Sequence, residues 1–343
     1  MSDLLVEPSS TSHAQRVIGG LLRSREIAVL SVLVALVLVT TLKSHGFLFS
    51  GTGWRDLLLT PSLLVILAVG QTVVIITRNV DLSVGSTLGL TAYLTGKLFT
   101  DHPGLPILAV FVIGMLFGAA LGLVNGVLVA WGKVPALVIT LGTLYIYRGA
   151  FLTWAGSDRV NASDLPRDFL ELGTQQVLTI PVLTLIAAAV LAVVGYVLHT
   201  ARSGRELYAI GSDPDAADLY GLPVARRVLL AFVASGALAG LAGIVYVARY
   251  GTVSSGAGSG IELQAVGAAV IGGVAIFGGS GTVWGAAIGG FLLVSINRAL
   301  PILGISDFWQ QAVVGALILA AVVLDRVLTL RQERLLVEAR DRS

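Results

Sequence analysis

The sequence predicts an all-α membrane protein with about ten transmembrane helices, some of them broken or re-entrant. Hydrophobic residues make up 55% of the 343-residue chain and charged residues only 12%, whereas roughly a quarter of the residues of soluble domains are charged. The apolar segments are long, continuous and rich in Leu, Ala, Val and Gly, and they lack the strict alternation of a membrane-spanning strand. These observations favour a bundle of spanning helices.

Ten apolar segments are candidate helices of a transmembrane domain that covers residues 27–325, between polar tails at residues 1–26 and 326–343. Several segments are shorter than the roughly 20 residues that a span needs and one is longer, so we expect some broken, tilted or re-entrant helices. In chain order the segments are Ile27–Leu42, Thr60–Thr77, Val84–Phe99, Leu105–Trp131, Ala136–Trp154, Val177–Leu198, Val228–Ala248, Leu263–Phe277, Thr282–Ile296 and Phe308–Leu324.

The positions of the basic residues predict that both tails are cytoplasmic. Lysine and arginine near the ends of spanning helices are retained preferentially on the cytoplasmic side of a membrane. With a cytoplasmic N-terminus, 14 of the 22 basic residues fall in the segments on that side. We therefore expect a multi-pass protein of the plasma membrane, with lipid along its sides.

Two polar breaks interrupt the apolar sequence at comparable places in its two halves, TRNVDLSVGS at 77–86 and FGGSGTVWG at 277–285. Interrupted helices in corresponding positions are typical of an internal repeat around a transport pathway. Asp81 and Ser83 also have side chains that cap helices, and we expect them to cap a helix that starts near Val84. Since an ionisable group at membrane depth must be paired or wet, a role in transport can accompany the cap.

Several polar side chains within the apolar segments are candidates to line a pathway for a hydroxylated solute, because amides, hydroxyls and aromatic rings recognise such solutes. Hydrogen bonding between helices is the alternative role. The candidates from the helices and the first break are Gln71, Asn79, Asp81, Ser83, Asn125, Tyr145, Tyr147, Arg148 and Asn297.

Glycines recur about every fourth residue in two of the apolar segments. This spacing places them on one helix face, where two backbones can approach closely. We expect tight helix packing, with a flexible gating role as the alternative. The glycines are Gly114, Gly118, Gly122 and Gly126, and Gly236, Gly240 and Gly243.

Signatures of catalysis are missing from the sequence. There is no cysteine and no G-x-x-x-x-G-K-[ST] phosphate-binding loop, and the four histidines are not spaced as metal ligands. We therefore expect a transport subunit without a catalytic residue, metal or cofactor of its own, and without a nucleic-acid partner.

A polar island at residues 199–227 separates two long apolar segments. Asp213 or Ser212 can cap a short helix that begins at Pro214, and Gly221 with the following proline can end it. We expect one short helix near Pro214–Tyr220 on the cytoplasmic surface. A solvated loop is the alternative.

Five motifs in order resemble the permease subunits of bacterial ATP-binding-cassette importers, in the ribose, rhamnose and autoinducer-2 branch. The resemblance covers nearly the whole chain after the N-terminal tail. The motifs are TRNVDLSVGS at 77–86, TLGTLYIYRG at 140–149, TARSGRELYAIGSDPDAADLYGLPV at 200–224, SGALAGLAGI at 235–244 and ELQAVGAAVIGGVAIFGGSGTVWGAAIGG at 262–290.

The resemblance implies that the loop at 204–223 holds a coupling helix, which rests in a groove of an ATPase subunit. The family commonly has asparagine where this chain has Asp213, so the acidic residues alter the chemistry of that contact. The positions implied to couple to the ATPase are Gly211, Asp213, Asp215, Ala216, Ala217 and Gly221.

The resemblance also implies the partners and the location. The partners are an ATP-binding-cassette subunit that uses ATP and Mg²⁺, an extracytoplasmic solute-binding protein, and a second permease copy or paralogue. The location is the bacterial inner membrane.

The solute expected from this resemblance is rhamnose, or a related deoxy-sugar or pentose. The segments RVNASDLPRDFL at 159–170 and NRALPILGISDFWQQ at 297–311 look most like rhamnose-type permeases, whereas the first two motifs are shared with autoinducer-2-type permeases. Autoinducer 2 is the alternative. An ion-coupled secondary transporter is less favoured, because it needs intramembrane carboxylates and Asp81 is the one ambiguous acid.

Overall fold

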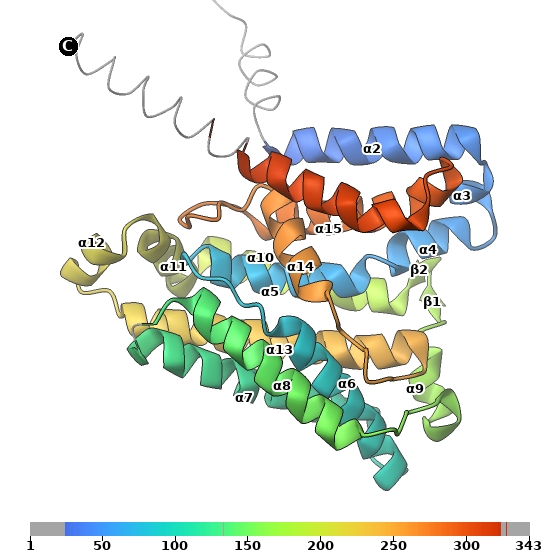
Figure 1. The fold of residues 1–343 in the computed structure, drawn as a ribbon, viewed down its shortest axis with the longest axis horizontal. Helices are drawn as coiled ribbons and strands as arrows, with labels where there is room; N and C mark the ends of the chain where they lie inside the picture. Colours follow the sequence, from blue (N-terminus) through green and yellow to red (C-terminus); the bar gives the residue numbers. More distant parts are fainter. Residues whose placement is uncertain (1–24, 133, 324–326, 328–343) are drawn as a thin grey trace, which may run out of the picture.

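The computed structural model describes residues 25–132, 134–323 and 327, which are almost entirely helical (Figure 1). Most of the two expected tails lies outside the described residues, as does Lys133. The all-α prediction is confirmed, and one two-stranded hairpin is the only sheet in the part described. The elements are α2 (Arg25–Lys43), α3 (Gly46–Phe49), α4 (Gly53–Leu59), α5 (Ser62–Ile75), α6 (Val84–Asp101), α7 (Ile107–Gly132), α8 (Ala136–Ala155), η1 (Ala162–Asp164), α9 (Arg167–Glu171), β1 (Gln176–Val177), β2 (Ile180–Pro181), α10 (Val182–Thr200), α11 (Arg202–Ser212), α12 (Pro214–Leu219), α13 (Val224–Tyr250), α14 (Ile261–Ile271), α15 (Val283–Ile302), η2 (Asp307–Trp309) and a helix at Gln310–Val323.

All ten candidate segments coincide with helices, although several bounds differ. Within the described residues, seven helices are long and apolar enough to cross a membrane. The other three candidates correspond to α6, to the short α14 and to the Gln310–Val323 helix. The seven are Glu26–Lys43, Gly53–Ile75, Ile107–Gly132, Ala136–Ala155, Val182–Thr200, Val224–Tyr250 and Val283–Ile302.

The candidate segment Val177–Leu198 begins as a hairpin and not as a helix. β1 and β2 pair antiparallel, with Val177 opposite Ile180. α10 starts only after Pro181, which is its N-cap residue. Proline is tolerated at the start of a helix but disrupts a helix interior, so the helix does not extend back through this residue. The turn was missed because its residues are apolar enough to extend the hydropathy pattern.

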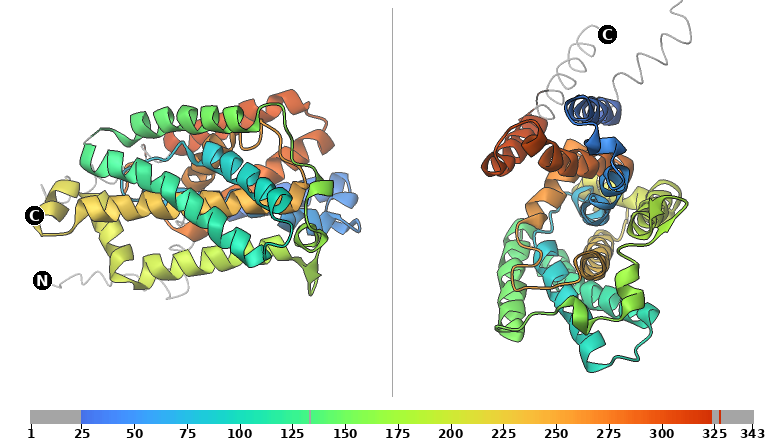
Figure 2. Two further views of the ribbon diagram at one scale, coloured as in Figure 1. Left: turned by 90° about the horizontal axis from the view of Figure 1, so that it is seen from below. Right: turned by 90° about the vertical axis from the view of Figure 1, so that its right-hand side faces the viewer.

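α5 lies inside the bundle and is buried along its whole length. α13 packs beside it and is also mostly buried, and α2, α7, α8 and α10 lie around the outside (Figures 1 and 2). These outer helices expose many apolar side chains. Outward apolar faces of this extent suit lipid or another membrane subunit. The break after α5 is mostly buried against these helices, whereas the break after α14 exposes Phe277, Ser280, Thr282 and Trp284.

α7 and α13 are in close contact through the glycines that the sequence spaces four apart. A Cβ atom at Gly118 would overlap the carbonyl oxygen of Gly236, and a Cβ atom at Gly236 would overlap that of Gly118. Gly240 lies against Gly114 in the same way. The predicted tight packing is confirmed, and it brings backbones close enough to gain dispersion contacts that lipid cannot match.

We expect Gly118→Ala to destabilise the folded chain by about 1–3 kcal/mol, because the added methyl group forces α7 and α13 apart. The matched control is Gly149→Ala in α8, where no atom lies within 4 Å of the added carbon. Thermal unfolding of the detergent-purified chain measures both. Equal midpoints for the two variants would contradict the packing argument.

Candidate coupling and translocation sites

The polar island folds into two helices, α11 and α12, at the end of the molecule opposite β1, β2 and α9 (Figure 1). The short helix expected near Pro214–Tyr220 is confirmed as α12. The preceding α11 was not expected. Its signal was present in the sequence, because Leu207 and Ile210 are three residues apart and both are buried, as in an amphipathic helix.

Asp213 caps α12, as one of the two expected caps. Its Oδ1 accepts hydrogen bonds from the backbone N–H groups of Asp215 and Ala216, at 3.1 and 3.0 Å. Gly221 follows the helix with a φ of +77°, in the left-handed region that favours glycine. The ends of α12 are therefore set by side-chain and backbone chemistry that the sequence already contains.

Some of the residues expected to couple to an ATPase lie on the surface of this region, and others are buried inside it. The buried residues can set the position of α12 but cannot contact a partner. Asp213, Asp215 and Gly221 are exposed, Ala216 is half-buried, and Gly211 and Ala217 are buried.

Two residues at the tip of α12 were missed by the sequence reasoning. Leu219 is 90% exposed and Tyr220 is 88% exposed, although both are large and apolar. Adjacent apolar side chains at the end of a projecting helix are the kind of anchor that interfaces use. Hydropathy gave no signal, because two apolar residues in a polar loop do not stand out.

Gly211, in the last turn of α11, lies against both polar breaks. A Cβ atom here would overlap the carbonyl oxygen of Ile76 in the connection after α5, and would lie 2.5 Å from Gly279 N in the connection after α14. Gly279 N donates to Ile76 O at 3.0 Å, and the Tyr208 hydroxyl donates to Gly281 O at 2.9 Å. The two breaks therefore meet at the end of α11, where α12 begins.

Arg78, in the first break, forms hydrogen bonds with the C-terminal end of α11. Its φ is +64°, which is uncommon for a residue other than glycine. Its Nε donates to Gly211 O at 2.6 Å, and its Nη2 donates to Ser212 O. Carbonyl groups at a helix C-terminus lack partners within the helix and attract cations. Arg78 thus links the end of α11 to the connection between α5 and α6.

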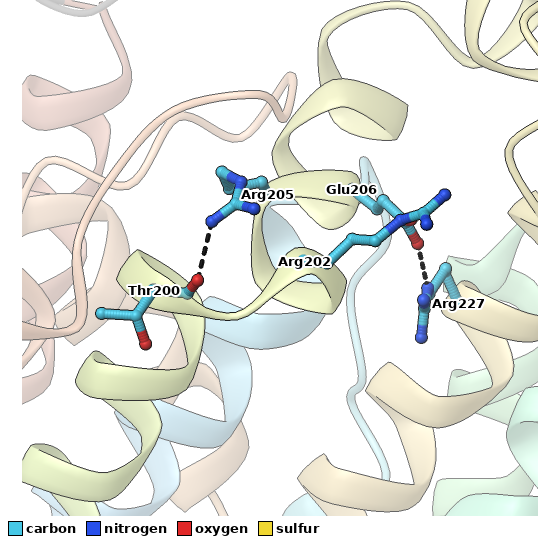
Figure 3. A network of polar contacts seen from close by, with 5 residues as sticks. All are labelled: Thr200, Arg202, Arg205, Glu206 and Arg227. Carbon is cyan, nitrogen blue, oxygen red and sulfur yellow. Dashed lines mark hydrogen bonds and ion pairs between the residues drawn. The ribbon is translucent and has the colours of Figure 1, made fainter.

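Two arginines hold Glu206, and together they fasten α11 to the first turn of α13 (Figure 3). Arg202 Nε lies 2.7 Å from Oε1 and Arg227 Nε lies 2.5 Å from Oε2, and the Glu206 side chain is only 7% exposed. Hydrogen bonds from Arg227 and then from Arg202 lower the pKa of Glu206 below its usual range. The same view shows Arg205, which donates to Thr200 O at 2.7 Å.

Four of the pathway candidates meet in a cluster inside the bundle. Ser83 Oγ donates to Asp81 Oδ1 at 2.7 Å, and Asn125 Nδ2 donates to Ser83 Oγ at 2.7 Å. Gln71 Nε2 donates to the Asp81 carbonyl oxygen, and Ser235 Oγ donates to Asp81 Oδ2 at 3.1 Å. All five residues are buried. The cluster joins α5, the first break, α7 and α13.

The expected capping of α6 is wrong in its geometry. Ser83 is the N-cap residue, but its side chain accepts no hydrogen bond from the first turn of the helix. Asp81 accepts from the backbone N–H of Ser83 at 3.0 Å and not from a helical N–H group. The reason is tertiary, because the Ser83 hydroxyl already donates to Asp81 and accepts from Asn125.

The remaining pathway candidates lie apart from this cluster. Asn79 is half-buried, and its Nδ2 donates to Thr77 O at 2.8 Å. Tyr145 is 69% exposed on α8. Arg148 Nη1 donates to Ala257 O at 2.7 Å and so fastens α8 to the loop before α14. Tyr147 is buried and donates to Leu121 O at 2.9 Å, and Asn297 lies in α15. The structure thus gathers four of the nine candidates in one cluster and leaves five outside it.

Comparison with known proteins identifies the family of the chain. Residues 54–322 match the model of a family described as "Branched-chain amino acid transport system / permease component". The chain belongs to this permease family. The "Autoinducer 2 import system permease protein LsrC" of Enterobacter sp. (strain 638) is 35% identical to it over 306 residues, 89% of this chain and 88% of the relative. The protein of that name from Escherichia coli (strain K12 / DH10B) is 36% identical over 272 residues, 79% and 78% of the two chains. No solved structure gives a significant match.

Membership confirms the resemblance drawn from the five motifs, to permease subunits of ATP-binding-cassette importers. The permease is a polytopic α-helical protein of the inner membrane. Its family works in general with an ATPase and a solute-binding protein. The family description and the relatives' names refer to different solutes, so membership assigns the role of a permease and not its solute.

The Glu206 ion pairs should make stability depend on pH. Because the pKa of Glu206 is lowered in the folded state, the pairs stabilise the permease above the ordinary glutamate pKa of about 4.3, and this contribution is lost as the pH falls through the lower, folded-state pKa. We expect Glu206→Gln to unfold at a lower temperature than wild type at neutral pH, and the two to converge in acid.

Thermal unfolding of the purified permease across this pH range measures the effect. The control is Glu171→Gln, which removes the more exposed Arg167–Glu171 pair and should change little, as surface pairs do. A gap between wild type and Glu206→Gln that stays constant at every pH would contradict the expectation.

Proposed function

We propose that this permease carries autoinducer 2 inward across the inner membrane, in an importer whose ATP hydrolysis is performed by a separate subunit. The observation that carries the proposal is the 35% and 36% identity to permeases named for autoinducer 2 import, over more than three quarters of each chain. The sequence favoured rhamnose or a related deoxy-sugar or pentose. The relatives support the alternative instead.

One of the two segments that look rhamnose-like has a structural explanation. Within residues 159–170, Val160 forms a β-bridge with Val253, and the Phe169 ring packs on Phe99 with 4.8 Å between centroids. Both Val160 and Phe169 are buried. Packing of this kind constrains the sequence without any contact to a solute, so likeness in this segment is weak evidence for rhamnose.

Coupling to the ATPase belongs, in this proposal, to the exposed surface of α12. Leu219 and Tyr220 provide apolar contact area, and Asp215 provides charge beside them. The buried Gly211 and Ala217 act by letting α12 sit close to the bundle. A displacement of α12 then reaches both polar breaks through the end of α11, because Gly211 touches each of them.

The pathway candidates take two roles in this proposal. The buried Gln71, Asp81, Ser83 and Asn125 hold α5, α7 and α13 together around the pathway, since none of them reaches the surface of the subunit. Tyr145 projects from α8, on a face that a second permease copy or a paralogue would cover. Asn79 and Arg148 position the loops that flank the pathway.

The division of labour follows from the same proposal. This chain performs no chemistry and binds no nucleotide, while ATP and Mg²⁺ are used by the cassette subunit. An extracytoplasmic solute-binding protein delivers the solute to the end of the molecule that carries β1, β2 and α9.

Uptake by the complete importer tests the solute. We expect proteoliposomes that contain the permease, its second permease subunit, the cassette subunit and the loaded binding protein to accumulate autoinducer 2 only with ATP. An excess of rhamnose should not compete. Uptake of rhamnose but not of autoinducer 2 would refute the solute, and ATP-independent, proton-driven uptake by this chain alone would refute the whole class.

Truncation at the tip of α12 tests the coupling surface. We expect the double variant Leu219→Ala, Tyr220→Ala to lower uptake at least tenfold, an effect of the size that interface anchors carry, while the abundance of the permease in the membrane is unchanged. Leu116→Ala is the control, because Leu116 is 64% exposed but lies in the middle of α7, away from α12 and from the hairpin. Wild-type uptake by the double variant would remove α12 from the coupling assignment.

A further inference from the structure

A cavity of about 400 Å³ lies between α14, the C-terminal half of α15 and the Gln310–Val323 helix. Its volume is within the range of small-molecule sites, roughly 300–1,000 Å³. Apolar side chains such as Leu263 and Ile318 form part of its wall. Its polar groups are the side chains of Ser259, Gln264, Asn297, Gln310 and Gln311.

The polar wall of this cavity consists of amides and one hydroxyl, and none of the described residues that line it is charged. An amide offers N–H donors and a carbonyl acceptor, and a hydroxyl group both donates and accepts, so the two match. No lining side chain would pair with either charged group of a zwitterionic amino acid. The cavity therefore suits a small, uncharged solute with several hydroxyl groups.

Asn297 brings unmet hydrogen-bonding capacity to the cavity. Its Oδ1 is buried and has no hydrogen-bond partner among the described residues. Its backbone carbonyl, by contrast, accepts from Gln310 Nε2 at 3.4 Å. A buried amide oxygen without a partner is unfavourable, and a hydroxyl group placed in the cavity would supply the missing donor.

The cavity lies on the same side of the molecule as α8. Ser259 in its wall is two residues from Ala257, whose carbonyl oxygen accepts from Arg148 of α8. α8 and the Gln310–Val323 helix lie along the same side of the molecule, as both views of Figure 2 show. This side carries the exposed Tyr145, one of the residues that the sequence marked as a pathway candidate.

We propose that this cavity is a station for the solute on its way through the importer, where Gln264, Asn297 and Gln311 hydrogen-bond to the hydroxyl groups of a small uncharged solute. The inference rests on the proposed import function. It adds to that function the residues of this chain that recognise the solute, none of which belongs to the buried Asp81 cluster.

The test uses the complete importer in proteoliposomes, with autoinducer 2 as the solute. We expect Asn297→Leu and Gln311→Leu each to lower the rate of uptake about tenfold, the effect of leaving one polar group of the solute unpaired. ATP hydrolysis stimulated by the loaded binding protein should stay at the wild-type rate, since α12 is untouched. Gln311 is exposed, so its variant folds even if the Asn297 variant does not. The control is Ser31→Leu, which replaces an exposed polar side chain on α2.

The outcomes separate this inference from the import function. Absence of uptake by the wild-type importer refutes the function itself. Wild-type uptake that both leucine variants retain refutes the cavity as a solute station. The inference is also refuted if the variants lose the stimulated ATP hydrolysis as well as uptake, or if the second permease subunit no longer co-purifies with them. Either result would assign the cavity to folding or to subunit assembly.

Discussion

The fold depends on one constraint, that every backbone polar group at membrane depth must find its partner within the protein. Both polar breaks leave helical hydrogen bonding and satisfy this constraint with tertiary partners. Gly279 N donates to Ile76 O, and Gln71 donates to the carbonyl oxygen of Asp81. The hydroxyl group of Tyr208, in α11, donates a hydrogen bond to Gly281 O. Irregular backbone is tolerated here because tertiary partners take the place of the lost helical hydrogen bonds.

The same constraint connects α11 and α12 with the interior of the bundle. The groups that satisfy the breaks are partly supplied by α11, and α12 begins directly after it. Gly211 has no side chain because Ile76 and Gly279 occupy that space, and Arg78 completes the junction from the other side. The connections after α5 and α14 and the end of α11 thus share one set of contacts.

The polar groups that hold the interior together differ from those that line the cavity near Asn297. The Asp81 cluster is fully buried and joins three helices, so it resembles the hydrogen-bonded glue of membrane bundles. The amides around Asn297 line a cavity and leave an oxygen without a partner. Both sets looked alike in the sequence, as polar residues within apolar segments. Burial and hydrogen bonding separate a structural role from a binding role.

The sequence by itself determined the class of the protein, its apolar helices, the family and the capped helix at Asp213, because hydropathy, motif order and capping are local properties. It also indicated the contact of α7 with α13, through glycines four residues apart. Only the tertiary structure decided that 177–181 is a hairpin, that Ser83 bonds to Asp81 and Asn125 in place of capping α6, and that both breaks meet at Gly211. These features depend on groups far apart in the chain, whose proximity no local pattern records.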